Sequence, residues 1–89
     1  MQATKSFKIG EYAVGGIIKA EVKGKVILIK ALDYYSKKEV QTGSVLATEN
    51  NAKFKLDNFL NELTSSYYAD KILKWVESKV ELHKRDGWY

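Results

Sequence analysis

The longest apolar run in the chain lies between Lys23 and Tyr35 and reads Lys-Gly-Lys-Val-Ile-Leu-Ile-Lys-Ala-Leu-Asp-Tyr-Tyr. β-branched and aromatic side chains dominate it, and polar turn residues bound it, which is typical of a strand. Both of its alternating faces are apolar, with Lys30 as the single charge on one of them. Because a strand with one face in water alternates more regularly, we expect its second face to be covered, by this chain or by another molecule.

Three further strands are predicted around this central strand, and the last of them is the weakest. Residues 7–14 form the first, and Gly15 and Gly16 follow as a two-residue hairpin turn in which both positions have positive φ. Residues 17–22 form the second strand and residues 39–48 the fourth. The pattern therefore predicts a four-stranded antiparallel meander over residues 7–48.

Turn geometry fixes the register of such a meander and sorts its side chains onto two faces. The expected pairs across the three turns are Val14 with Ile17, Val22 with Lys25, and Tyr35 with Glu39. One face is then small and aliphatic and carries Phe7, Ile9, Ala13, Ile18, Ala20, Val22, Ile27, Ile29, Ala31, Val45 and Ala47. The opposite face is mixed and carries Lys8, Tyr12, Val14, Ile17, Lys19, Glu21, Val26, Leu28, Lys30, Leu32, Tyr34, Val40, Thr42, Ser44 and Leu46.

Two helices are predicted after the sheet. Asp57 is the expected N-cap of a short helix that ends near residue 63, and a longer helix covers residues 66–83. The longer helix has an apolar stripe at helical spacing, which we expect to pack on the aliphatic sheet face. Its tail, residues 84–89, is expected to dock on the domain or to form a contact site. The whole chain, residues 1–89, is thus predicted to be one α+β domain.

Composition narrows the function only moderately. An 89-residue chain has room for one modest core, so assembly into a homodimer or larger oligomer would stabilise it. The absence of cysteine excludes disulfides, a thiolate nucleophile and cysteine metal sites. Residues 1–6 lack an apolar leader and no run is long enough to span a membrane, so a soluble cytoplasmic protein is expected, inside the host cell if the chain is viral. The net charge of +4 rests on 15 basic residues, all lysine except Arg85, and permits nucleic acid or an acidic protein as partner.

Patterns typical of catalysis and of metal binding are missing. His83 is the only histidine and lies near the end of a predicted helix, where a catalytic role is not favoured. No serine lies in a nucleophile elbow, and Gly15 and Gly16 belong to no phosphate-binding loop motif. We therefore expect neither an enzyme nor a cofactor.

The constellation that remains combines basic and aromatic residues. Lysines neutralise phosphates, and aromatic rings stack on unpaired bases with about 1–3 kcal/mol per contact. The same side chains would also suit a subunit interface or a second small core, and both interpretations stay open. The residues that the pattern itself suggests are Tyr12, Lys19, Lys30, Tyr34, Lys37 and Lys38.

Three short motifs resemble those of a known family. They are Phe7-Lys8-Ile9-Gly10, the hairpin Val22-Lys23-Gly24-Lys25-Val26-Ile27, and Asp33-Tyr34-Tyr35. Over residues 7–48 the chain is similar to the eukaryotic transcriptional positive coactivators and their Whirly relatives, which bind single-stranded nucleic acid. The resemblance implies that a curved sheet binds unpaired strands while helices assemble dimers or rings. By position it points to Lys8, Lys25, Lys30 and Tyr34 or Tyr35 as contacts.

The chain departs from that family in two places. The basic segment that enters the family's fourth strand is replaced here by the uncharged Gln41-Thr42-Gly43-Ser44, and the second helix is longer than expected. These departures leave RNA binding, or a protein-binding derivative of the fold, open beside DNA binding.

Together these observations predict a non-enzymatic protein that binds single-stranded DNA or RNA through the mixed sheet face. On this hypothesis, replacing Lys19 and Lys30 together by glutamate abolishes binding and leaves the fold intact. The alternative is a small accessory or inhibitor protein, of the type carried by viruses and mobile elements, that occludes an acidic surface of a larger protein. Partner type and the salt dependence of binding distinguish the two.

Overall fold

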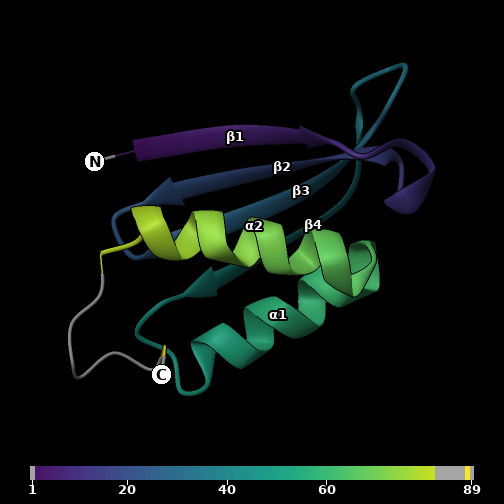
Figure 1. The fold of residues 1–89 in the computed structure, drawn as a ribbon. Coiled ribbons are helices and arrows are strands. Elements are labelled where there is room, and N and C mark those ends of the chain that lie inside the picture. Colours follow the sequence, from purple (N-terminus) through teal and green to yellow (C-terminus); the bar gives the residue numbers. More distant parts are fainter. Residues whose placement is uncertain (1, 82–87, 89) are drawn as a thin grey trace.

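The fold is a four-stranded antiparallel sheet with two helices on one of its faces (Figure 1). It is seen in a computed structural model that describes residues 2–81 and Trp88. The elements in chain order are β1 (Gln2–Lys8), a 3-10 turn η1 (Gly10–Tyr12), β2 (Gly16–Lys23), β3 (Val26–Asp33), β4 (Glu39–Leu46), α1 (Ala52–Leu63) and α2 (Ser66–Lys79). The strands lie side by side in the order β1-β2-β3-β4, so the predicted α+β meander is confirmed.

The register differs from the predicted one by even numbers of residues, except at a bulge between β3 and β4. There Glu39 lies opposite Leu32, where Tyr35 was expected. Lys23, not Val22, begins the pairing with β3, where it lies opposite Val26. In β1, Lys8 lies opposite Ile17, where Val14 was expected. Because side chains alternate with a period of two, an even shift leaves each of them on its predicted face. This explains why the division into an aliphatic and a mixed face is correct for most strand residues although the turns are not. The exception is the bulge, where Glu39 joins the mixed face.

The first strand was predicted too late in the chain. β1 ends at Lys8, and residues 9–15 leave the sheet and cross toward the helices. There the amide N–H of Val14 donates to the carbonyl of Leu63 at 2.8 Å, and Ala13 forms an isolated bridge with Thr64. The positive φ of Gly15 and Gly16, +75° and +108°, thus serves this longer connection and not a two-residue hairpin. Val14 consequently packs against the core and does not lie on the mixed face.

The core lies between the sheet and the helices. Its buried side chains are Ile18, Ala20, Val22, Ile27, Ile29, Ala31, Val45, Ala47, Ala52, Leu56, Leu60, Leu63, Ala69, Ile72, Leu73, Val76, Val80 and Trp88. Half-buried Phe7 extends this core to β1, because its ring packs edge-on against Trp75 with 6.2 Å between centroids. The apolar stripe predicted on the longer helix therefore does face the aliphatic side of the sheet.

Both helices have boundaries that differ from the predicted ones. α1 begins at Ala52, so Asp57 lies within the helix and is not its N-cap. The cap position is Asn51, which adopts a left-handed conformation with φ of 59°. α2 ends at Lys79 with Val80 as its C-cap, whereas residues 82 and 83, including His83, lie outside the described part. Of the predicted tail, Trp88 is described and is buried, with 1% of its surface exposed.

Candidate functional site

The face of the sheet opposite the helices is called the open sheet face here. Within the described part of the chain no helix covers it (Figure 1). By register, β2, β3 and β4 give it Ile17, Lys19, Glu21, Lys23, Val26, Leu28, Lys30, Leu32, Glu39, Thr42, Ser44 and Leu46. The edge strand β1 adds Gln2, Thr4, Ser6 and Lys8. It is the mixed face of the sequence prediction.

The two central lysines of the open sheet face pair with glutamates of the same face. Lys19 Nζ lies 3.2 Å from Glu21 Oε1. Lys30 Nζ lies 3.8 Å from that same oxygen and 3.3 Å from Glu39 Oε1. Two positive and two negative side chains thus balance each other, and a phosphate would have to compete with carboxylates for both lysines.

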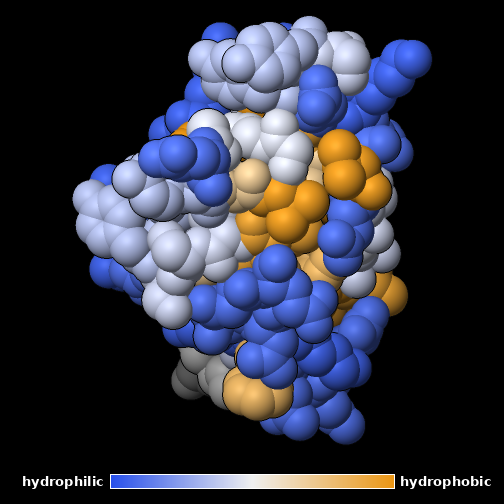
Figure 2. Space-filling model, turned by 90° about the vertical axis from the view of Figure 1, so that its right-hand side faces the viewer, coloured by the Kyte–Doolittle hydropathy of each residue, from blue (hydrophilic) through white to orange (hydrophobic). Residues whose placement is uncertain are grey.

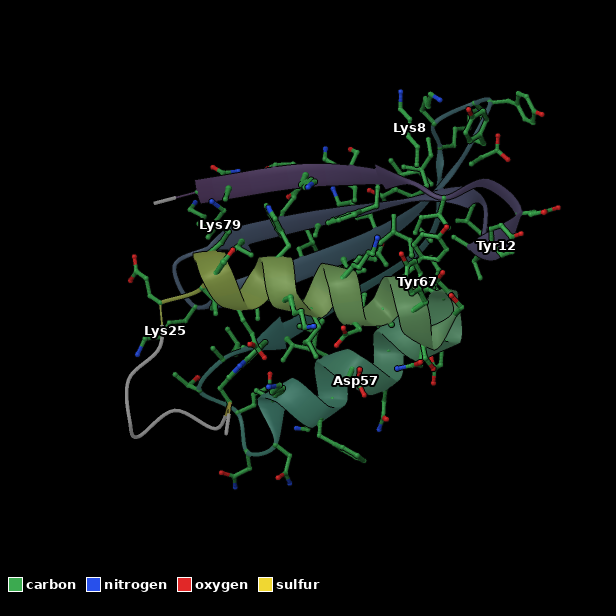
Figure 3. The ribbon with its side chains drawn as sticks, in the orientation of Figure 1. Lys8, Tyr12, Lys25, Asp57, Tyr67 and Lys79 are labelled. Carbon is green, nitrogen blue, oxygen red and sulfur yellow. The ribbon has the colours of Figure 1, made fainter. Side chains whose placement is uncertain are left out.

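Tyr12 and Lys25 are predicted contact residues that do not lie on this face. Tyr12 was expected opposite Lys19, but it lies in η1, where its carbonyl accepts a hydrogen bond from the Thr64 hydroxyl. Its ring packs on Tyr68 of α2 with 6.0 Å between centroids. Lys25 lies in the β2–β3 turn, at the end of the molecule opposite Lys8 (Figure 3).

The fold instead gathers basic and aromatic residues at one end of the molecule, where β1 and β3 end and α2 begins. Five of the six tyrosines in the chain meet there, together with lysines from three segments. Figure 3 shows Lys8, Tyr12 and Tyr67 at this end. We call it the tyrosine-rich end, and it consists of Lys8, Tyr12, Tyr34, Tyr35, Lys37, Lys38, Tyr67, Tyr68 and Lys71.

Asp33 orders the β3–β4 loop that carries Tyr34 and Tyr35. Its carboxylate accepts hydrogen bonds from the backbone N–H of Ser36 at 2.8 Å and of Tyr35 at 3.0 Å. The N–H of Tyr34 donates to the carbonyl of Gly15 at 2.7 Å, which ties the loop to the start of β2. The two tyrosine rings meet edge to face with 5.3 Å between centroids, yet 90% of Tyr35 is exposed. The loop therefore presents a ring to solvent from an ordered backbone.

Lysine side chains accompany these rings. Lys37 Nζ lies 4.9 Å from the ring centroid of Tyr34, and its ammonium also donates to the Tyr34 carbonyl. Lys8 lies at the end of β1 and borders an open hollow of about 640 Å³ between η1 and the loop. The lining of this hollow is Lys8, Ile9, Gly10, Glu11, Ala13, Gly15, Gly16, Tyr34 and Tyr35. Its volume lies within the range of about 300–1,000 Å³ that is typical of small-molecule sites, so it can accept a nucleobase or an amino-acid side chain.

A second aromatic group lies on the helix side of the same end. The rings of Tyr67 and Tyr68 meet at 5.0 Å, and Lys71 Nζ lies 4.5 Å from the Tyr67 centroid. Hydrogen bonding to the Tyr67 side chain raises the pKa of Lys71 above its ordinary value, which further favours the charged ammonium. Figure 2 looks onto this end and shows a hydrophobic patch bordered by side chains of intermediate hydropathy and by hydrophilic ones.

The order of the loop should depend on pH through Asp33. The hydrogen bond from the Ser36 backbone, followed by those from the Ser36 side chain and the Tyr35 backbone, lowers the pKa of this carboxyl below its ordinary value. A depressed pKa gives a stabilising contribution that is complete above about pH 3.9, the ordinary value for aspartate. That contribution is lost as the pH falls through the lower folded-state pKa.

We therefore expect the amide NMR signals of Tyr35 and Ser36 to shift toward random-coil positions as the pH falls below about 3.9. The variant Asp33→Asn removes the titrating group but keeps an oxygen that accepts hydrogen bonds, so its signals should stay constant through this range. Equal shifts in both proteins would contradict the role of Asp33. Local amide signals are the suitable measurement, because the pKa of Glu49 is also lowered, first by a hydrogen bond from the Leu46 backbone, and affects global stability.

The structure brings five of the eight predicted contact residues together at the tyrosine-rich end: Lys8, Tyr12, Tyr34, Lys37 and Lys38. Lys19 and Lys30 lie in the paired network of the open sheet face, and Lys25 lies at the far end of the sheet. The contribution of Tyr67, Tyr68 and Lys71 was missed. A signal for it existed in the chain, because Tyr67 and Lys71 are four residues apart in the first turns of a helix and so share a face.

Other kinds of site find no support in the part of the chain that the structure describes. Over residues 2–81 and 88, no three histidine, cysteine, aspartate or glutamate side chains are placed to hold a metal ion. No helix in the same residues has the length and apolar character needed to cross a membrane. Searches for a matching protein family, for a similar curated protein and for a similar solved structure found none.

Proposed function

We propose that the protein binds single-stranded nucleic acid at its tyrosine-rich end, without catalysing a reaction. The observation that carries this proposal is the exposure of Tyr12, Tyr34, Tyr35 and Tyr67 at one end, with lysines beside them. Bases that are not paired offer free faces to such rings, while the lysines contact phosphates. Stacking tolerates every base, so the proposed binding has little sequence preference.

Each side chain has a defined role in this proposal. Tyr35 offers the most exposed ring and stacks on a base, while Tyr34 supports it from the side. Lys8 borders the hollow and Lys37 lies over the Tyr34 ring, so both can contact phosphates of a strand bound there. The rings of Tyr67 and Tyr12 extend the surface to the helix side, where a longer strand would continue.

The open sheet face is a weaker candidate for the same task. The ammonium groups of Lys19 and Lys30 are held at 3.2–3.8 Å from glutamate oxygens. A phosphate that bound there would have to displace a carboxylate from each lysine, and it would also be repelled by Glu21 and Glu39. The Asp33 carboxylate at the tyrosine-rich end is engaged differently, because it accepts hydrogen bonds from backbone N–H groups. The neighbouring Lys37 ammonium donates to a backbone carbonyl and not to a carboxylate.

The proposal is tested by titrating the protein into labelled single-stranded DNA, single-stranded RNA and duplex of equal length at several salt concentrations. We expect single strands to bind more tightly than duplex, with affinity that falls as salt rises. Replacing Tyr35 by alanine should cost about 1–3 kcal/mol, which is about 5- to 150-fold in affinity, whereas Tyr35→Phe keeps the ring and should bind nearly as the parent does. Exposed Phe54 of α1 gives the matched control, because Phe54→Ala removes a ring elsewhere.

Charge-matched variants locate the phosphate contacts. Lys8→Gln with Lys37→Gln should weaken binding and reduce the salt slope by about two, since each lysine contributes about one phosphate contact. The control Lys53→Gln with Lys74→Gln removes the same charge from the helix layer and should change affinity far less. If Lys19→Gln with Lys30→Gln has the larger effect, the site lies on the open sheet face, as the sequence suggested. If neither single-stranded DNA nor single-stranded RNA binds at low salt, the proposal fails. A protein partner for the tyrosine-rich end then becomes the hypothesis to test.

A further inference from the structure

We infer that the open sheet face is the contact surface for a second copy of this chain. Its central strand, β3, points three aliphatic side chains away from the helices, Val26, Leu28 and Leu32, and one lysine. On β4, Leu46 lies opposite Val26 and adds a fourth. A sheet face that stays in water carries polar residues at such positions. This inference is independent of the proposed binding of nucleic acid, which uses the end of the molecule.

Exposure of these side chains supports a covered face. Val26 is 43% exposed and Leu46 is 44% exposed, and they lie side by side across β3 and β4. They account for two of the eight large hydrophobic side chains that are exposed among the described residues. Four of the remaining six are tyrosines of the tyrosine-rich end, so the aliphatic pair on the open sheet face forms a separate patch. Adjacent exposed apolar residues of this kind are typical of interaction surfaces.

The charges on the open sheet face favour a copy of the same chain over a charged partner. Lys19 and Lys30 balance Glu21 and Glu39, so the middle of the face has no net charge to attract an acidic or a basic surface. A network with equal numbers of both signs is complementary to itself under a two-fold rotation, because each lysine can then lie over a glutamate of the other copy. The other two lysines of the face, Lys8 and Lys23, lie at its two ends, outside this network. The aliphatic side chains beside the network would be buried in the same contact.

The size of the face sets the expected strength of the dimer. Four strands about 4.8 Å apart and eight residues long, at about 3.3 Å per residue, form a flat area of about 500 Å². Side chains that protrude from the sheet make its solvent-accessible area larger than this flat area. A standard interface buries about 800 Å² per partner, and smaller interfaces belong to weak complexes. We therefore expect reversible association, with dimer populated at tens of micromolar protein and monomer at nanomolar protein.

Sedimentation velocity across this concentration range tests the inference. The parent protein should shift from 10.2 kDa to about twice that mass as its concentration rises. Two charge-reversal variants then test the surface. Lys19→Glu with Lys30→Glu makes the network wholly negative, and Glu21→Lys with Glu39→Lys makes it wholly positive. Each variant alone should stay monomeric because two copies repel, and an equimolar mixture of the two should regain the mass of a dimer.

The mixture also guards against misfolding, because an unfolded variant could not restore a dimer. A second variant, Leu46→Lys, places a charge in the aliphatic patch and should also give a monomer, whereas Phe54→Lys on α1 changes an even more exposed apolar side chain and should leave the dimer intact. The inference is overturned if the parent stays monomeric at tens of micromolar, if the charge-reversal variants dimerise as the parent does, or if their mixture stays monomeric. It is overturned too if Phe54→Lys has the larger effect.

Discussion

Replacing Trp88 by alanine is expected to lower the free energy of unfolding by about 3–5 kcal/mol. Trp88 is the largest fully buried side chain among the described residues, and it belongs to the same buried cluster as the sheet residues and both helices. With Phe54 and Leu73 it also lines a hollow of about 440 Å³ beside α1 and α2. Removing the indole would enlarge this hollow at the place where the two helices and Trp88 meet.

The expected loss is a large part of the stability of so small a domain, which is about 5–15 kcal/mol in typical cases. Urea unfolding followed by circular dichroism measures it. Trp88→Phe keeps most of the apolar volume and should cost less than about 1.5 kcal/mol. A cost below about 1 kcal/mol for Trp88→Ala would show that this side chain contributes little to the fold. Binding of single-stranded nucleic acid should be retained under conditions where the variant is folded, because Trp88 lies away from the tyrosine-rich end.

The sequence predicted the architecture because side chains alternate between the two faces of a strand. An error of an even number of residues in a turn therefore leaves each side chain on its correct face. Ile27 and Ile29 face the helices in every register that differs from the true one by an even number of residues. The limits of β1 were mistaken because Phe7 to Val14 is the more apolar segment, while the true strand, Gln2–Lys8, is mostly polar and exposed. A polar strand at the edge of a sheet gives little hydrophobic signal.

The start of α1 was missed for a different reason. The spacing of its buried residues, Ala52, Leu56, Leu60 and Leu63, is helical and readable. The cap is Asn51 in a left-handed conformation, without a side-chain hydrogen bond, so the usual capping pattern is missing there. Asp57 looked like a cap by its residue type and its place before an apolar pair.

The candidate site depended on tertiary structure that local patterns do not encode. Lysines and tyrosines were recognised as the relevant residue types, but alternation assigned them to a sheet face. Their meeting at one end requires that residues 9–15 cross to the helices and that the start of α2 lies beside η1. The ion pairs of Lys19 and Lys30 with Glu21 likewise depend on register and rotamer, which residue type alone does not give.

Gly15 contacts β3 and also holds the loop of the tyrosine-rich end. Replacing it by alanine is therefore expected to lower the stability of the fold and to displace that loop. Its φ is +75°, and a Cβ at this position would lie 2.6 Å from the carbonyl oxygen of Leu32 and 2.9 Å from the carbonyl carbon. Since both are backbone atoms of β3, no side-chain rotation relieves the clash. The positive φ costs about 1–2 kcal/mol for an L-residue, and overpacking adds about 1–3 kcal/mol. We expect a total loss of about 2–5 kcal/mol, measured by urea unfolding.

Gly10→Ala is the matched control for this prediction. Gly10 has a similar φ, +69°, but a Cβ there would have no atom within 4 Å, so only the conformational cost applies. The difference between the two variants therefore isolates the contact with Leu32. The carbonyl of Gly15 also accepts the hydrogen bond from the Tyr34 N–H. Displacing this carbonyl should therefore move the β3–β4 loop and weaken the binding of single-stranded nucleic acid. Gly10→Ala should weaken this binding less. Equal stability losses in the two variants would mean that β3 moves to accommodate the added methyl group. If Gly15→Ala is destabilised but binds single-stranded nucleic acid normally, the position of the loop does not matter for the proposed binding.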